Sequence, residues 1–167
     1  MSQHTQIQQT AEQQAAHAPQ FASTLIVDDQ RFDRSRLKKL CSQLAFTTHV
    51  AEADSLCALR DRLKKDRFDL VLLDYHLTDS TGIEGVEIIR ADAVNRDAAT
   101  VMITGTQERD ITVQALKMGM SDYLTKDELG PETLARAAIT ALQKAQLARL
   151  ALTGATPPAP CPLPAAR

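Results

Sequence analysis

The chain has 167 residues, a formal net charge of -2 and a composition ordinary for a globular protein. This length suits one domain with tails, and the small negative charge argues against a nucleic-acid-binding protein. No apolar run approaches the ~20 residues of a membrane span, and the N-terminus lacks the plan of a signal peptide, so we expect a cytoplasmic location.

Two terminal segments are predicted to be disordered. Residues 1–22 are rich in Gln and Ala, and residues 151–167 are rich in Pro and Ala. Neither segment has enough large apolar side chains to offset the entropy lost on ordering. We therefore expect a single folded domain over residues 23–150.

Within that domain, apolar patterning predicts five strands that alternate with five helices. The strands are predicted at Ser23–Val27, Thr47–Ala51, Phe68–Asp74, Thr100–Ile103 and Asp122–Thr125. The helical stripes span Leu37–Leu44, Leu56–Leu63, Val86–Val94, Thr106–Met118 and Pro131–Leu150. This alternation favours an α/β fold, a doubly wound parallel sheet with right-handed crossovers.

Several local features follow from the same patterning. Asp54 is expected to cap the second helix, and Tyr75–Gly85 is expected to be a long loop. Cys41 and Cys57 are expected to be small core residues on apolar stripes, whereas Cys161 is expected to be a free thiol in the tail.

Polar residues follow the predicted strands at one edge of the sheet. The flavodoxin-like strand order 2-1-3-4-5 places the first and third strands side by side, so Asp28, Asp29 and Asp74 should converge. Clustered carboxylates repel one another, and Mg²⁺ would relieve that repulsion. Thr104 and Lys126 follow the fourth and fifth strands. Together these groups supply what phosphoryl transfer to a carboxylate needs: an acceptor, a metal, and cationic or hydroxyl partners for the phosphoryl oxygens.

Each residue also has a structural explanation. Asp28 and Asp29 could cap a helix, Thr104 could begin a turn, Lys126 could be a solvated surface charge, and Tyr123 could be half-buried core. The functional interpretation depends on these groups all following strands at one edge of the sheet.

The strand-end motifs resemble the receiver domain of bacterial two-component response regulators, over about residues 23–150. The segments that carry the resemblance are Leu25–Asp29, Leu70–Asp74, Val101–Gly105 and Gly119–Lys126. The resemblance implies that Asp74 is the phosphorylation site. It also implies that Asp28, Asp29, Asp74 and the backbone carbonyl of His76 hold Mg²⁺.

The resemblance further implies that Lys126 and Thr104 bind the phosphoryl oxygens and that Thr104 and Tyr123 form a switch pair. Family partners are a sensor histidine kinase, a histidine phosphotransfer protein, or both. A downstream protein would read the face formed by the fourth helix, fifth strand and fifth helix. Because only a short proline-rich tail follows residue 150, we expect a stand-alone receiver without nucleic-acid binding or a membrane span.

Some positions depart from the family pattern. Thr78 stands where receivers often have proline, and Asp127 follows Lys126 where proline is common; Asp127 could pair with that lysine. The loop after Asp74 is longer than usual unless Gly82 is the matching glycine. His76 is expected to be a solvated loop residue, with an influence on acyl-phosphate hydrolysis as the alternative.

Two other functions are compatible with parts of this pattern. A phosphorylation-independent scaffold would have no use for the acids, Thr104 and Lys126. A haloacid-dehalogenase-like phosphatase needs a second Asp two residues after its nucleophile, where this chain has His76.

A dimer through Ala138, Leu142, Ala145 and Arg149 of the last helix is the alternative to simple packing of that stripe on the sheet.

Overall fold

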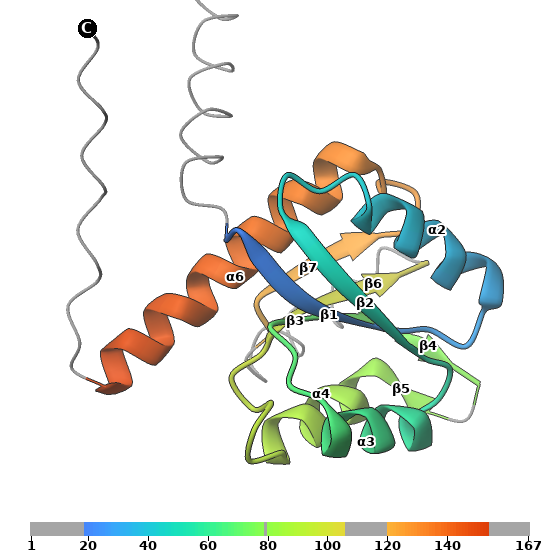
Figure 1. Ribbon diagram of the computed structural model, residues 1–167. Coiled ribbons are helices and arrows are strands. Elements are labelled where there is room, and N and C mark those ends of the chain that lie inside the picture. Colours follow the sequence, from blue (N-terminus) through green and yellow to red (C-terminus); the bar gives the residue numbers. More distant parts are fainter. Residues whose placement is uncertain (1–18, 79, 106–119, 154–167) are drawn as a thin grey trace, which may run out of the picture.

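The computed structural model describes residues 19–78, 80–105 and 120–153. Five parallel strands form one sheet in the order β2-β1-β3-β6-β7, which is the predicted order 2-1-3-4-5 (Figure 1). The strands are β1 (Phe21–Val27), β2 (Thr47–Ala53), β3 (Leu70–Asp74), β6 (Ala99–Thr104) and β7 (Asp122–Thr125). Each predicted strand is therefore present, with ends that differ by at most two residues.

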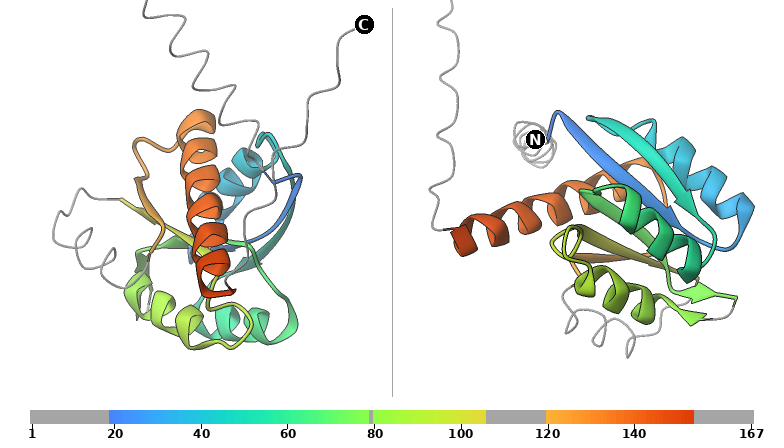
Figure 2. Two further views of the ribbon diagram at one scale, coloured as in Figure 1. Left: turned by 90° about the vertical axis from the view of Figure 1, so that its left-hand side faces the viewer. Right: turned by 60° about the horizontal axis from the view of Figure 1, so that its bottom comes forward.

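Helices cover both faces of this sheet. One face packs against α2 (Arg31–Cys41) and α6 (Pro131–Thr153), and the other against α3 (Leu56–Lys65) and α4 (Gly82–Ala91) (Figures 1 and 2). The predicted helix at Thr106–Met118 lies outside the described residues. The doubly wound flavodoxin-like architecture is thus confirmed.

The side-chain alternation of β3 explains why both faces need a cover. Leu70 and Leu72 belong to the core on the α2 and α6 side, whereas Val71 and Leu73 belong to the core on the α3 and α4 side. All four are fully buried. Burying side chains of this size stabilises a fold by roughly 1.5–3 kcal/mol each, so β3 anchors the sheet and fixes the position of Asp74 at its end.

The segment after β3 is more regular than predicted. Instead of a loop over Tyr75–Gly85, the chain forms a short antiparallel hairpin, β4 (His76–Leu77) with β5 (Ser80–Thr81), and then enters α4 at Gly82. The backbone N–H of Thr81 donates to Glu84 Oε1 at 3.3 Å, as in a capping box. This Thr-x-x-Glu pattern is a helix-start pattern that the apolar periodicity alone did not reveal.

Two other local predictions were wrong. Ser55, not Asp54, caps α3, because its hydroxyl accepts from the Ala58 N–H at 3.2 Å. Cys57 is exposed, because its position lies on the outer side of α3, away from the buried Leu56, Leu59 and Leu63. Cys41 is buried in the core as predicted.

The apolar stripe of α6 packs mainly on its own domain. Ala138 is fully buried, Leu142 and Ala145 pack against the core, and Arg149 donates to the Asp97 carbonyl at 3.0 Å. The end of the helix extends beyond the sheet, where Leu152 is 80% exposed (Figure 2). The residues named for a possible dimer therefore have intramolecular partners. Among the described helices, none is both long and apolar enough to cross a bilayer.

Candidate functional site

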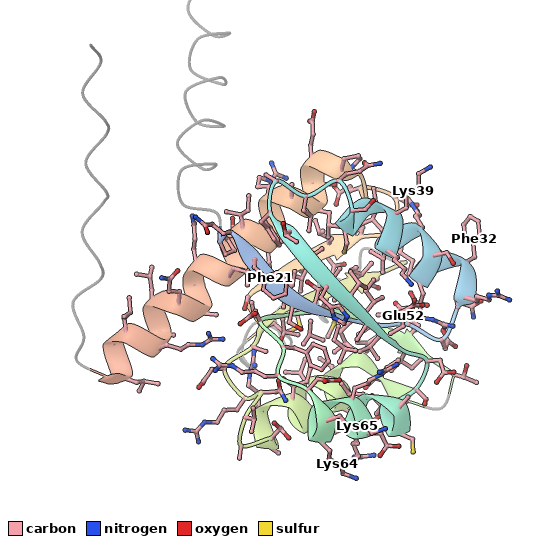
Figure 3. The ribbon with its side chains drawn as sticks, in the orientation of Figure 1. Phe21, Phe32, Lys39, Glu52, Lys64 and Lys65 are labelled. Carbon is pink, nitrogen blue, oxygen red and sulfur yellow. The ribbon has the colours of Figure 1, made fainter. Side chains whose placement is uncertain are left out.

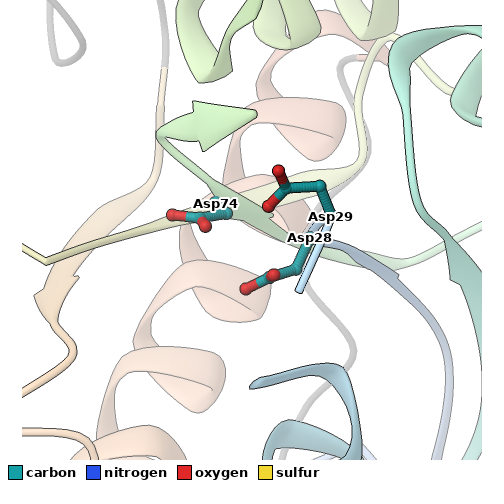
Figure 4. Close-up of side chains that lie close together, drawn as sticks. All are labelled: Asp28, Asp29 and Asp74. Carbon is teal, nitrogen blue, oxygen red and sulfur yellow. The ribbon is translucent and has the colours of Figure 1, made fainter. Parts of the chain in front are cut away.

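Three carboxylates meet where β1 and β3 end. Val27 and Leu73 are register partners in these neighbouring parallel strands, so the residues that follow them reach the same edge of the sheet. Asp28, Asp29 and Asp74 each place a carboxylate oxygen within 4.8 Å of the others (Figure 4). The predicted convergence of these acids, from positions more than 40 residues apart in sequence, is therefore present in the structure.

The Asp28 carboxylate is buried in this cluster. Its side chain is fully inaccessible, and Oδ1 accepts from the Gln30 N–H at 2.7 Å. Burial, together with the nearby charge of Asp74, raises the Asp28 pKa to about 6. Asp74 is also buried, and its Oδ1 accepts from the His76 N–H at 3.3 Å. The fold thus holds Asp28 in an environment that disfavours its charge.

Lys126 brings a positive charge to the same pocket. The Lys126 N–H donates to the Thr104 carbonyl at 2.7 Å, which continues the pairing of β7 with β6. Its Nζ lies 2.8 Å from Asp74 Oδ2 and 3.4 Å from Asp28 Oδ2. Burial alone would lower the Lys126 pKa, but hydrogen bonds to Asp33 and Asp74 raise it above the usual value. The lysine is therefore a charged partner of the acids.

A fourth acid, Asp33, was missed by sequence reasoning. It lies in the first turn of α2, and its Oδ2 accepts from Lys126 Nζ at 2.7 Å. Asp33 lies only four residues after Asp29, but Asp29 precedes the helix, so apolar periodicity does not indicate that Asp33 reaches the site. The ion pairs found for Lys126 within the described chain go to Asp28, Asp33 and Asp74, and the suggested pairing with Asp127 is not among them.

The two predicted switch residues lie on the neighbouring strands β6 and β7. Thr104 is fully buried at the end of β6, one residue beyond Ile103, the register partner of Asp74. Tyr123 is half-buried in β7, where it is the register partner of Met102, and it packs against the core on the α3 and α4 side. Their switching role stays a prediction.

The β4–β5 hairpin borders the acidic cluster. The Thr78 hydroxyl donates to Asp29 Oδ2, so the residue that replaces the common proline holds one of the clustered carboxylates. His76 is exposed, and its ring meets the Tyr75 ring edge-on with 4.8 Å between centroids. This exposure agrees with a solvated loop histidine. The predicted role of the His76 carbonyl as a metal ligand remains a prediction.

The donor set fits a hard divalent cation. Magnesium prefers carboxylate and carbonyl oxygens and usually retains several waters, so a few protein ligands suffice. The oxygens of Asp28, Asp29 and Asp74 lie close enough together to share one ion. A cation would also favour the charged form of Asp28, whose pKa is raised by burial and by the nearby charge of Asp74. The residues present therefore suit Mg²⁺.

Comparison with known proteins agrees with this geometry. Residues 24–139 match the family model of the response regulator receiver domain. The chemotaxis protein CheY of Pseudomonas aeruginosa is 32% identical over 102 residues, which cover 61% of this chain and 82% of that protein. CheY-3 of Vibrio cholerae is 34% identical over 102 residues, with 61% and 78% covered.

Solved structures show the same fold. Vibrio cholerae CheY4 superposes with a TM-score of 0.63 at 25% identity, covering 75% of this chain and 98% of that one. The receiver domain of a Pseudomonas aeruginosa sensor histidine kinase, solved with a magnesium ion in its active-site cleft, gives a TM-score of 0.64 at 20% identity, covering 73% and 98%. The matched family model, the CheY relatives and the strand order together show that this chain belongs to the response regulator receiver domain family and is CheY-like.

Proposed function

We propose that Asp74 accepts a phosphoryl group from a phosphohistidine of a sensor histidine kinase or a histidine phosphotransfer protein. The observation that carries this proposal is the contact between Lys126 Nζ and Asp74 Oδ2 at 2.8 Å, inside a cluster of carboxylates suited to a divalent cation. A buried acid paired with a cation and surrounded by metal-binding oxygens suits a phosphoryl acceptor better than a structural ion pair.

Magnesium is part of this proposal. Asp28, Asp29, Asp74 and the backbone carbonyl of His76 would hold the ion, which would supply positive charge for the phosphoryl oxygens. Thr78 fixes the Asp29 carboxylate through its hydroxyl, and the Gln30 N–H fixes Asp28. These hydrogen bonds orient the acids before any ligand arrives, and such preorganisation favours binding.

The transfer step is a displacement at phosphorus. An Asp74 carboxylate oxygen forms the new P–O bond while the P–N bond to the donor imidazole breaks, and the leaving nitrogen keeps the electron pair. Lys126 and the Thr104 hydroxyl would donate to the phosphoryl oxygens, where negative charge is concentrated. Hydrolysis by water returns the Asp74 carboxylate and inorganic phosphate, so the chain acts as a transient phosphoryl carrier and not as a turnover enzyme.

The signal would then leave the site through Thr104 and Tyr123. In this proposal the Thr104 hydroxyl moves toward the phosphoryl group and the Tyr123 ring turns inward behind it. The surface that changes would include β7 and α6. A cytoplasmic partner protein that binds the two forms with different affinity would read the change.

Intact-mass spectrometry tests the acceptor directly. The protein is incubated with Mg²⁺ and acetyl phosphate, a small phosphodonor, and we expect a gain of one phosphoryl mass. Asp74→Asn removes the nucleophile and should abolish that gain. Omitting Mg²⁺ should reduce it strongly.

Asp61→Asn is the matched control. It makes the same chemical change on the exposed side of α3, where the ion pair found for Asp61 in the described part of the chain is with Lys64 at 3.5 Å. The control should gain mass like the parent. A parent that gains no mass, or an Asp74→Asn variant that gains as much as the parent, contradicts the proposal.

A further inference from the structure

The ammonium of Lys126 is shared between Asp33 and Asp74, with Asp28 Oδ2 farther away at 3.4 Å. Its Nζ lies 2.7 Å from Asp33 Oδ2 and 2.8 Å from Asp74 Oδ2. Asp33 belongs to α2 and Asp74 to β3, so the ammonium bridges a helix and a strand end. Asp33 retains a quarter of its side-chain exposure, whereas Asp74 is almost fully buried. The ammonium is thus held at nearly equal distances by a partly solvated acid and a buried one.

The same helix also holds the backbone beside Lys126. Arg36, one turn after Asp33, donates to the Leu129 carbonyl at 2.7 Å and to the Lys126 carbonyl at 3.4 Å. Other α2 side chains, such as Phe32 and Lys39, point outward (Figure 3). One side of α2 therefore contacts both ends of the Lys126 residue, which makes the Asp33 contact part of a larger attachment and not a chance meeting of surface charges.

We propose that Asp33 is a positioning residue that competes with a phosphoryl group on Asp74 for the Lys126 ammonium. This inference rests on the proposed function. An ammonium held by Asp33 is less available to a phosphoryl group on Asp74, and the Asp33 charge repels that group directly. Before phosphorylation, the same contact leaves the Asp74 and Asp28 oxygens more available to Mg²⁺.

Loss of the Asp33 charge should therefore shift two affinities in opposite directions. Without Asp33, Lys126 has only Asp74 and Asp28 to neutralise it, so it competes more strongly with Mg²⁺ for the same oxygens. The site also loses one negative charge, and Mg²⁺ binding weakens. A phosphoryl mimic gains, because a repelling charge is gone and the ammonium is free to contact it.

The test measures both affinities in Asp33→Asn, which keeps the size of the side chain. Mg²⁺ binding is followed by calorimetry without any phosphoryl mimic. Binding of fluoroberyllate (BeF₃⁻), an anionic phosphoryl mimic, is followed by ¹⁹F NMR at saturating Mg²⁺. We expect Mg²⁺ affinity to fall and fluoroberyllate affinity to rise, each by about fivefold, the effect of a unit charge at a few ångströms in a well-solvated site.

Asp127→Asn is the matched control. Asp127 is next to Lys126 in sequence and is exposed, but the ion pairs found for Lys126 in the described chain do not include it. Opposite shifts in Asp33→Asn that are absent in Asp127→Asn support the inference. The inference is overturned if both affinities are unchanged, or if the control shows equal shifts. It is also overturned if both affinities fall together, as damage to the site would cause.

The parent protein separates this inference from the function beneath it. If the parent binds Mg²⁺ and fluoroberyllate but Asp33→Asn lacks the opposite shifts, only the role of Asp33 is wrong. If the parent binds neither ligand, the proposed function fails and the inference fails with it.

Discussion

Gly82 lies against the backbone of the strand end that carries Asp74. A Cβ added at Gly82 would lie 2.7 Å from the Asp74 carbonyl oxygen and 2.9 Å from the Tyr75 Cα. The Gly82 N–H also donates to the Tyr75 carbonyl at 2.7 Å. The start of α4 therefore lies directly against the backbone of Asp74, the proposed acceptor, and Gly82 is the glycine that makes this approach possible.

Gly82→Ala should destabilise the protein by about 2–3 kcal/mol, because backbone atoms cannot move aside as a flexible side chain can. Denaturant unfolding followed by circular dichroism measures the change. The displaced backbone should also reduce phosphorylation of Asp74 by acetyl phosphate, measured at a temperature where the variant is folded.

Gly85→Ala is the control in the same helix. Its added Cβ would approach the Leu73 methyl groups at 3.0 and 3.1 Å, and these can move. Alanine also gains helix propensity worth up to ~1 kcal/mol over glycine, which offsets part of the crowding. Equal losses of stability in the two variants would contradict the specific role given to the Gly82 contact.

The raised pKa of Asp28 predicts that the free energy of unfolding of the metal-free protein depends on pH, with a cost in stability where Asp28 would ordinarily be charged. The pKa rises from 3.8 to about 6 on folding, so the folded state favours the protonated acid. Well below pH 3.8, Asp28 is protonated in both states and the cost is absent. Between about pH 3.8 and 6 the unfolded state ionises while the folded state stays protonated, so stability falls by roughly 2–3 kcal/mol and remains at that lower level above pH 6.

Asp28→Asn removes that cost. Without Mg²⁺, the variant should be more stable than the parent at pH 7.5 and closer to it near pH 4, as measured by denaturant unfolding. Added Mg²⁺ should stabilise the parent more at pH 7.5 than at pH 5, and it should stabilise the variant less. A variant that is less stable than the parent at both pH values would show that the pairing of Asp28 with Lys126 outweighs its burial.

The sequence predicted the parts of the site that follow from strand ends. The positions of Asp28, Asp74 and Lys126 could be predicted because each directly follows or ends a hydrophobic strand. Parallel strands bring their carboxyl ends to one edge of the sheet. Asp33 could not be found this way. It lies inside a helix, and its partner Lys126 is 93 residues away, so the contact depends on how α2 packs against the sheet and on where the chain goes after β7.

Apolar periodicity alone wrongly predicted the burial of Cys57 and the structure of the segment before α4. Cys57 shares a face with Arg60 and Lys64, at helical spacing, and is therefore exposed. The hairpin before α4 was missed because short two-residue strands leave almost no periodic pattern. The start of α4 was missed because Gly82 is a poor helix former, although the preceding Thr81 and the later Glu84 form a helix-start pattern.

Asn95 is a buried connector that sequence patterning also missed. Its Oδ1 accepts from the Phe68 N–H at 2.7 Å, and its Nδ2 donates to the Leu63 and Asp66 carbonyls, each at 3.1 Å. The side chain is fully inaccessible. It thus ties the end of α3 to the chain that enters β3.

Asn95→Ala should cost about 2–4 kcal/mol, because it leaves one N–H donor and two carbonyl acceptors buried without their partner. Thermal unfolding measures the change. Ser42→Ala, at an exposed position directly after α2, is the control, and its stability should change little. At low temperature, phosphorylation of Asp74 should be unaffected, since Asn95 lies at the opposite end of β3. A loss below 1 kcal/mol would show that water replaces the amide.

The two described cysteines should differ sharply in reactivity. Burial raises the pKa of Cys41 to about 12, so almost no thiolate, the reactive form, is present at neutral pH. Cys57 is exposed and lines a cleft beside Asp29 and Thr78. Iodoacetamide followed by peptide mass mapping should label Cys57 in the native protein and Cys41 only after denaturation.

Cys57→Ser serves as the control: it should remove the Cys57 label without exposing Cys41. Native labelling of Cys41 at a rate near that of Cys57 would mean that α2 opens readily from the sheet, because solvent reaches this thiol only when that core face separates.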